Sequence, residues 1–166
     1  MSTKDFSSVQ EKNIADSLGW DVVSGSGSRH LSPGDVISDQ WLGECKTHVT
    51  PGQMIAFLES VWEKLQEEAD SRFKFPVLFV DDGSQDLEKT WCMMRFAPMS
   101  DYMELDPPSS VRSFDSSVSF KHDIVYRIHK SNYSKYNSPI LYRLEVSGKP
   151  VYITHFFDFR ELLGVY

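Results

Sequence analysis

One short segment, residues 35–46, constrains the fold of this chain more than any other part of the sequence. It consists of two strand-like runs that are joined only by Asp39-Gln40. A two-residue connection between such runs predicts an antiparallel β-hairpin. In the register that this turn imposes, Asp35 lies directly opposite Glu44, and directly opposed side chains have Cβ atoms about 4.5–5.5 Å apart.

The hairpin predicts that charge is concentrated on one face. Lys46 follows Glu44 by two residues, so it points to the same side of the strand. Asp35 and Glu44 repel each other at this separation, and a fold tolerates such a pair when a cation lies between them. Carboxylate oxygens select Mg²⁺ or Mn²⁺, and the backbone carbonyl of Cys45 could supply a further oxygen ligand.

This grouping of two carboxylates and an ammonium suits phosphodiester hydrolysis. A divalent ion polarises a phosphate and lowers the pKa of a bound water, while Lys46 could orient that water or stabilise the pentacovalent transition state. The alternative interpretation is an ordinary solvated salt-bridge cluster on a surface hairpin. The small-residue loop that leads into Asp35 and the apolar neighbours of Glu44 favour the chemical interpretation.

The remaining patterns predict an α/β core up to about Phe96 and a β-rich addition before the C-terminus. Thr50, Pro51 and Gln53 have the spacing of a helix start, with a capping box and proline at the first helical position. The predicted helices cover residues 4–18 and about 50–70, with a last helical turn near Phe159. The predicted strands cover residues 20–23, 35–38, 41–46, 76–80, 90–96, 140–146 and 151–156, and residues 98–118 are predicted to be a long connection.

The totals fit one domain without a membrane span. The chain has 166 residues, and no apolar run approaches the roughly 18 residues that would cross a bilayer. The first residues do not have the pattern of a secretory signal. Cys45 and Cys92 form no CxxC pair, which favours a reduced, intracellular (cytoplasmic) protein, although a disulfide between them stays open.

The net charge of −7 counts against a nucleic-acid partner, because affinity for DNA comes largely from neutralising phosphates. The distribution of charge weakens that objection. Residues 121–149 hold six lysines and arginines against two acidic residues, interleaved with tyrosines. We therefore predict DNA contacts at Lys130 and Lys135, with a solvated β-rich face as the alternative. Arg29 and His30, at the tip of the small-residue loop, are further candidates for phosphate contacts.

The order of these features resembles a known family. Asp35 and Glu44-Cys45-Lys46 follow a helix that carries Glu11 and a loop that contains Gly25-Ser26-Gly27-Ser28. This arrangement is similar to the PD-(D/E)XK nuclease superfamily, and within it to the archaeal-type Holliday junction resolvases, which some phages also encode. The likeness covers about residues 4–96 and 157–166.

The resemblance implies a restriction-endonuclease-like core, a mixed sheet flanked by helices, forming a single nuclease domain over residues 1–166. It implies Glu11, Asp35 and Glu44 as ligands of Mg²⁺, Lys46 as the catalytic lysine, and Ser26 or Ser28 as a contact of the scissile phosphate. Gly34 stands where the family name has proline. The segment 98–156 is longer than the family pattern and is predicted to be an insertion.

The function that follows from the resemblance is resolution of four-way DNA junctions by a homodimer that cuts phosphodiester bonds. Two alternatives stay open at this point. One is a related nuclease that acts on flaps or single-stranded DNA, with tyrosines of the predicted insertion stacking on unpaired bases. The other is a non-catalytic DNA-binding domain on the same fold.

Overall fold

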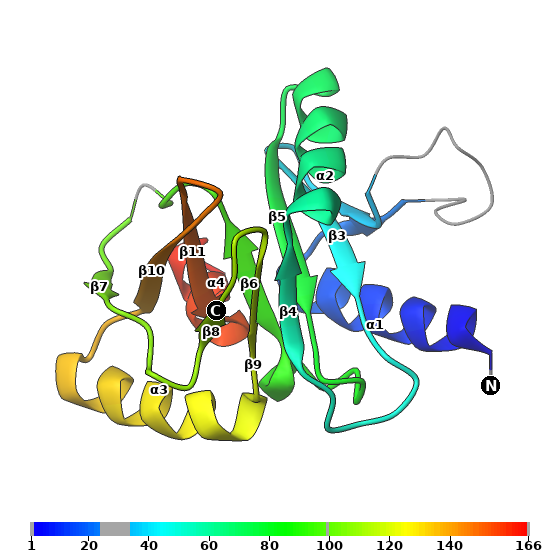
Figure 1. Cartoon of the computed structure of the whole chain (residues 1–166). Coiled ribbons are helices and arrows are strands. Elements are labelled where there is room, and N and C mark those ends of the chain that lie inside the picture. Colours follow the sequence, from blue (N-terminus) through cyan, green and yellow to red (C-terminus); the bar gives the residue numbers. More distant parts are fainter. Residues whose placement is uncertain (1, 24–33, 99, 166) are drawn as a thin grey trace.

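The computed structural model describes residues 2–23, 34–98 and 100–165, and its main feature is an eight-stranded mixed sheet (Figure 1). Strands β3 and β5 are parallel, as are β7 and β10, and the other neighbours are antiparallel. In spatial order the strands are β1 (Asp21–Val22), β2 (Val36–Ile37), β3 (Trp41–Lys46), β5 (Phe75–Val80), β6 (Trp91–Met94), β11 (Lys149–His155), β10 (Ile140–Val146) and β7 (Met103–Leu105).

The predicted hairpin at residues 35–46 is confirmed with its register. Val36 pairs with Gly43 and Ile37 with Leu42, as the predicted register requires. Asp35 lies just before these paired residues, and its N–H donates to the carbonyl oxygen of Gly43 at 2.8 Å. Gly43 pins this register because a Cβ atom there would lie 2.6 Å from the Phe79 ring and 2.7 Å from a Val36 methyl group. A slip by one residue would turn every side chain of the strand to the other face.

Helix α1 (Thr3–Leu18) agrees with the predicted helix 4–18. It buries Ile14, Ala15 and Leu18 against the sheet, and Gly19 ends it in the left-handed conformation that glycine adopts without strain. The chain then enters β1, so the strand predicted at 20–23 is present in a shorter form.

The predicted helix 50–70 is wrong in its first part. Helix α2 begins at Glu59 and ends at Ser71. Ile55–Leu58 form strand β4 of a second sheet, which pairs with β9 (Ser117–Phe120), and β9 pairs with β8 (Arg112–Ser113). The cap signals at Thr50 and Pro51 are local, and the burial of Ile55 and Phe57 beside β9 overrides them.

The second half of the chain also differs from the prediction. The segment 98–118 contributes strands β7 and β8 and the start of β9, and helix α3 (His122–Tyr136) occupies part of the segment that was interpreted as β-rich. The buried face of α3 consists of His122, Val125 and His129. Two of these three residues are histidines, so an apolar pattern with helical period was hardly visible in the sequence.

The predicted hairpin before the C-terminus is confirmed as β10 and β11, and the last helical turn is α4 (Phe156–Leu162). A 3₁₀ turn, η1 (Leu87–Lys89), precedes β6. Because β11 pairs with β6, strands from the segment 98–156 continue the main sheet. That this segment is an insertion relative to a family stays a prediction.

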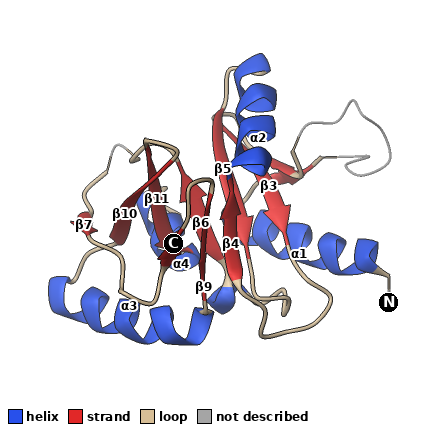
Figure 2. Ribbon diagram, in the orientation of Figure 1, coloured by secondary structure: helices blue, strands red, loops and turns tan. Residues whose placement is uncertain are grey.

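Helices cover both faces of the main sheet, which confirms the mixed sheet flanked by helices in its coarse form (Figure 2). Helices α1 and α4 share one face, where Arg160 donates to Ser17 at 3.0 Å and Phe159 lies 5.3 Å from Trp41 and 5.8 Å from Phe79 between ring centroids. Helix α2 packs on β5 and β3 from the other side. Among the described helices, none is both long enough and apolar enough to span a membrane.

Candidate active site

The carboxyl end of β3 carries the charged residues that the sequence analysis singled out. The ammonium of Lys46 lies 3.0 Å from a carboxylate oxygen of Glu44. The carboxylate of Asp35 accepts the backbone N–H of Cys45 at 2.8 Å, so it reaches across the end of the hairpin to the residue between Glu44 and Lys46. The predicted grouping of Asp35, Glu44 and Lys46 is therefore present in the structure, while the chemical role of each residue stays a prediction.

Glu11 reaches the same region from helix α1. Burial, together with the negative charges of Asp35 and Glu44, raises the pKa of Glu11 to about 7. Burial is the larger cause of this shift, and the two carboxylates add to it by repelling the charged form of Glu11. The helix is tied to the strand at this point, because the neighbouring Gln10 donates its side-chain N–H to the carbonyl oxygen of Lys46 at 2.8 Å.

The two other ionisable groups at the end of β3 behave differently from each other. Burial lowers the pKa of Lys46, but the charge and hydrogen bond of Glu44 outweigh it, so the pKa is raised and the side chain stays an ammonium. The thiol of Cys45 is buried, and burial followed by the surrounding carboxylates raises its pKa well above the ordinary value. Cys45 and Cys92 are both free and buried.

The backbone conformation of Gly34 sets the direction in which the chain enters Asp35. Gly34, which precedes it, has φ +70°, and its N–H donates to a carboxylate oxygen of Glu68 at 3.2 Å. Proline cannot adopt this φ, because its ring holds φ near −65°. Gly34 stands where the family name has proline, and its backbone conformation is one that proline could not adopt.

Four predicted site residues, Ser26, Ser28, Arg29 and His30, lie outside the described residues. Lys130 and Lys135, the two other residues predicted to contact DNA, are exposed on helix α3. Each ammonium lies 4.9 Å from the ring centroid of a tyrosine, Tyr126 and Tyr136 respectively. They do not join the carboxylate cluster.

Helix α3 nevertheless lies on the side of the molecule where β3 ends. Figure 1 shows α3 along the lower side of the view, the side to which the arrow of β3 points. Lys121, just before the helix, donates to the carbonyl oxygen of Gly52 in the loop that follows β3, at 3.3 Å. The start of α3 is thus connected to the loop that follows β3.

The tyrosines of this region are less available than the alternative of base stacking requires. Tyr142 is fully buried, and Tyr126 stacks on the rings of His122 and His155, at centroid distances of 4.9 and 4.8 Å.

The sequence analysis missed a set of polar side chains directly behind Lys46, namely Gln10, Thr47, Asp81 and Gln85. One signal was available for Asp81, because it follows a buried strand that runs parallel to β3, and parallel strands end at the same edge of a sheet. No comparable signal pointed to Gln85.

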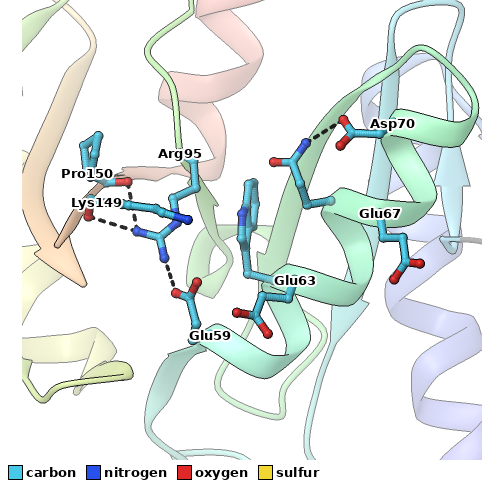
Figure 3. Close-up of a pocket in the computed structure, with 9 residues that line it drawn as sticks. Glu59, Glu63, Glu67, Asp70, Arg95, Lys149 and Pro150 are labelled. Atoms are coloured by element: carbon cyan, nitrogen blue, oxygen red, sulfur yellow. Dashed lines mark hydrogen bonds and ion pairs between the residues drawn. The ribbon is translucent and has the colours of Figure 1, made fainter. Parts of the chain in front are cut away.

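A pocket of about 500 Å³ lies away from this site, between α2 and the β10–β11 hairpin (Figure 3). Arg95 closes one end of it, held by Glu59 and by the carbonyl oxygens of Lys149 and Pro150. Its other lining residues are Trp62, Glu63, Gln66, Glu67 and Asp70. The acidic residues on α2 would repel phosphates, so this pocket is no candidate for a DNA-binding groove.

The carboxyl groups of Glu11, Asp35 and Glu44 fit a hard divalent cation, because they are oxygen donors whose mutual repulsion such an ion would relieve. In the part of the chain that the structure describes, no three histidine, cysteine or acidic side chains already stand close enough together to hold a metal ion.

Neither a protein-family model, nor a curated protein, nor a solved structure matches this chain. The resemblance to the nuclease superfamily therefore stays an interpretation of the residues quoted above.

Proposed function

We propose that this protein is a metal-dependent endodeoxyribonuclease with a PD-(D/E)XK-type site on a restriction-endonuclease-like fold. The observation that carries the proposal is the grouping of Lys46, Glu44 and Asp35 at the end of one hairpin, with the carboxyl group of Glu11 titrating under the influence of the latter two. A solvated salt bridge explains Lys46 and Glu44 alone. It does not explain why Asp35 accepts the backbone N–H of the residue between them, or why both carboxylates act on Glu11.

Glu11, Asp35 and Glu44 would hold Mg²⁺ or Mn²⁺, with the carbonyl oxygen of Cys45 as a further donor. When bound, this ion supplies charge to polarise the phosphate and to lower the pKa of a water. The side chain of Lys46 is about half exposed, at 49 %, so its ammonium is accessible to a phosphate oxygen. It would stabilise the charge that develops when water attacks the phosphorus atom and the bond to the leaving oxygen breaks.

The substrate we propose is a branched DNA, a four-way junction. A homodimer would present two such sites about a two-fold axis and nick opposing strands. The exposed lysines of α3 would contact phosphates, which position the protein without reading sequence. The burial of Tyr142 and the stacking of Tyr126 on two histidines make recognition of unpaired bases by these tyrosines the weaker alternative.

The test is a cleavage assay with Mg²⁺ on four-way junction, flap, single-stranded and duplex DNA. We expect the wild type to cut the junction fastest, and Glu44→Gln or Lys46→Ala to slow cleavage by about 100-fold or more while junction binding persists. Glu145→Gln is the matched control, an exposed carboxylate on β10 of the same sheet. Equal cleavage by wild type and Glu44→Gln would mean that the site is wrong, and faster cutting of flaps would retire the junction.

A further inference from the structure

The carboxyl end of β3 is held by a set of polar side chains that the proposed chemistry does not use. We call Gln10, Thr47, Asp81 and Gln85 the β3-end cluster. Asp81 is fully buried, and Gln10 and Gln85 are 1 % and 9 % exposed. Together they surround the backbone on both sides of the junction between Lys46 and Thr47.

Asp81 and Gln85 grip this backbone from the turn that follows β5. The hydroxyl of Thr47 donates to a carboxylate oxygen of Asp81 at 2.5 Å, and the backbone N–H of Asp81 donates to the carbonyl oxygen of Lys46 at 3.3 Å. The side-chain amide of Gln85 donates to the Thr47 hydroxyl at 2.9 Å and to the carbonyl oxygen of His48 at 3.2 Å. Hydrogen bonds thus hold three consecutive residues, Lys46, Thr47 and His48, at the end of the strand.

Gln10 grips the same point from helix α1. Its side-chain N–H donates to the carbonyl oxygen of Lys46, the acceptor that Asp81 also uses. One turn along the helix, Asn13 donates to the carbonyl oxygen of Gln85 at 3.0 Å. The helix that carries Glu11 and the strand that carries Glu44 and Lys46 are therefore joined through the cluster.

The cluster costs stability that aliphatic side chains at the same positions would not. A second oxygen of Asp81 and the amide oxygen of Gln10 are buried without a hydrogen-bond partner. Gln85 adopts φ +59°, a left-handed conformation that is unfavourable for a residue with a Cβ atom. Unsatisfied buried groups and strained backbone are concentrated in proteins at functional sites, where the surrounding structure holds them in place.

We propose that Thr47 and Asp81 are positioning residues which, together with Gln10, hold Lys46 in a fixed place relative to Glu11 and Glu44. This inference rests on the proposed function. The physical reason is that β3 ends at Lys46, so no further ladder bonds fix the chain beyond it. The side chain of Lys46 is long and half exposed, and a fixed backbone is what limits the region its ammonium can reach.

The experiment compares Thr47→Val with Thr47→Ser, and uses Thr154→Val as a matched control. Thr154 is a buried threonine whose hydroxyl also donates a hydrogen bond, to the carbonyl oxygen of Ile140 at 2.7 Å, and it lies on β11, which β5 and β6 separate from β3. Cleavage with Mg²⁺ is measured on the DNA that the wild type cuts fastest, together with the thermal midpoint of each variant.

We expect Thr47→Val to lower kcat about 10- to 100-fold with KM unchanged within about two-fold, as for other residues that orient a reacting group. Thr47→Ser should recover most of kcat because it keeps the hydroxyl. Thr154→Val should lower the thermal midpoint, because it removes a buried hydrogen bond, but leave kcat unchanged. If the two valine variants retain the same kcat, the positioning role is overturned.

A second measurement separates this inference from the proposed function. Amide hydrogen exchange at residues 45–48 should accelerate about 10-fold or more in Thr47→Val and stay unchanged in Thr154→Val. If the wild type cuts none of the DNA substrates, the proposed function fails, and this exchange measurement still decides whether the cluster fixes the end of β3. Unchanged exchange in Thr47→Val overturns the inference on its own.

Discussion

At the scale of single residues, a glycine in β3 and a group of buried histidines determine how the neighbouring side chains pack. Gly43 lets the Phe79 ring and Val36 pack against the strand that carries Glu44 and Lys46. On the other side of the molecule, His122, His129 and His155 are buried in a group with Trp91, where polar rings take the place of an aliphatic core.

Gly43→Ala should destabilise the protein by about 1–3 kcal/mol, because the added Cβ would lie 2.6 Å from the Phe79 ring in a closely packed layer. Urea unfolding measures this difference. Phe79→Leu removes the clashing ring atoms, so the double variant should lose less stability than the sum of the two single variants. Strict additivity would mean that the ring does not restrict position 43.

Acid should destabilise the protein through His155. Burial lowers the pKa of His155 to about 4, and its ring nitrogens are engaged by the carbonyl oxygen of Glu88 and the N–H of Phe157. The unfolded chain, in which the pKa of histidine is about 6.5, binds the proton more readily, so stability falls as pH decreases from about 6.5 towards 4. The loss is on the order of 3 kcal/mol.

Urea unfolding at a series of pH values measures this loss, and His155→Gln should make the dependence between pH 6.5 and 4 shallower. His129, Asp158 and His122 also act on the ring, so part of the dependence should remain. An unchanged slope in His155→Gln would assign the acid sensitivity to other groups.

At the scale of elements, two segments form secondary structure that their local sequence patterns do not predict. Residues 55–58 follow a good helix start but form β4, because pairing with β9 buries Ile55 and Phe57. Helix α3 is not predicted by the sequence, because its segment is rich in lysine, tyrosine and histidine. Its exposed side carries Lys130 and Lys135, and its start adjoins the loop that follows β3.

Replacing Lys130 and Lys135 together by alanine should weaken binding to junction DNA and lower the salt dependence of binding by about two phosphate contacts. Fluorescence anisotropy between low and moderate salt measures both quantities. The control pair is Lys64 and Lys149, exposed lysines near the acidic pocket, whose replacement should leave the salt dependence unchanged. If both pairs of substitutions lowered the salt dependence equally, the cause would be net charge alone and not phosphate contacts of α3.

At the scale of the whole molecule, a single sheet unites the two halves of the chain. Strand β6 from the first half pairs with β11 from the second, and the buried residues Trp91 and Met93 lie on that boundary. The pocket between α2 and the β10–β11 hairpin also draws its lining from both halves. The segment 98–156 therefore contributes to the core, whether or not it is an insertion relative to a family.

A chain that lacks residues 98–156 should fail to fold, because β6 would lose β11, one of its two neighbours, and the side chain of Trp91 would face water. Circular dichroism and the width of the unfolding transition measure this. A cooperative transition in the shortened chain would show that the first half folds independently, which is what a peripheral insertion would allow.

The hairpin at residues 35–46, helix α1, strand β5 and the β10–β11 hairpin could all be predicted from the sequence, because turn length, caps and side-chain periodicity act over a few residues. The proximity of Asp35 to the segment that carries Glu44 and Lys46 follows from the same short-range rules. Strands β4 and β7–β9 could not be predicted, since they are short and are stabilised by partners far away in the chain.

The position of Glu11 beside the carboxylates and the β3-end cluster behind Lys46 depended on the fold. Gln10 and Lys46 are separated by 36 positions, and Thr47 and Asp81 by 34. No local pattern encodes such contacts, because they arise only when a helix and two parallel strands pack together. Their buried polar groups then form hydrogen bonds with one another. Short-range sequence rules thus account for the charged hairpin, whereas long-range packing decides which residues surround it.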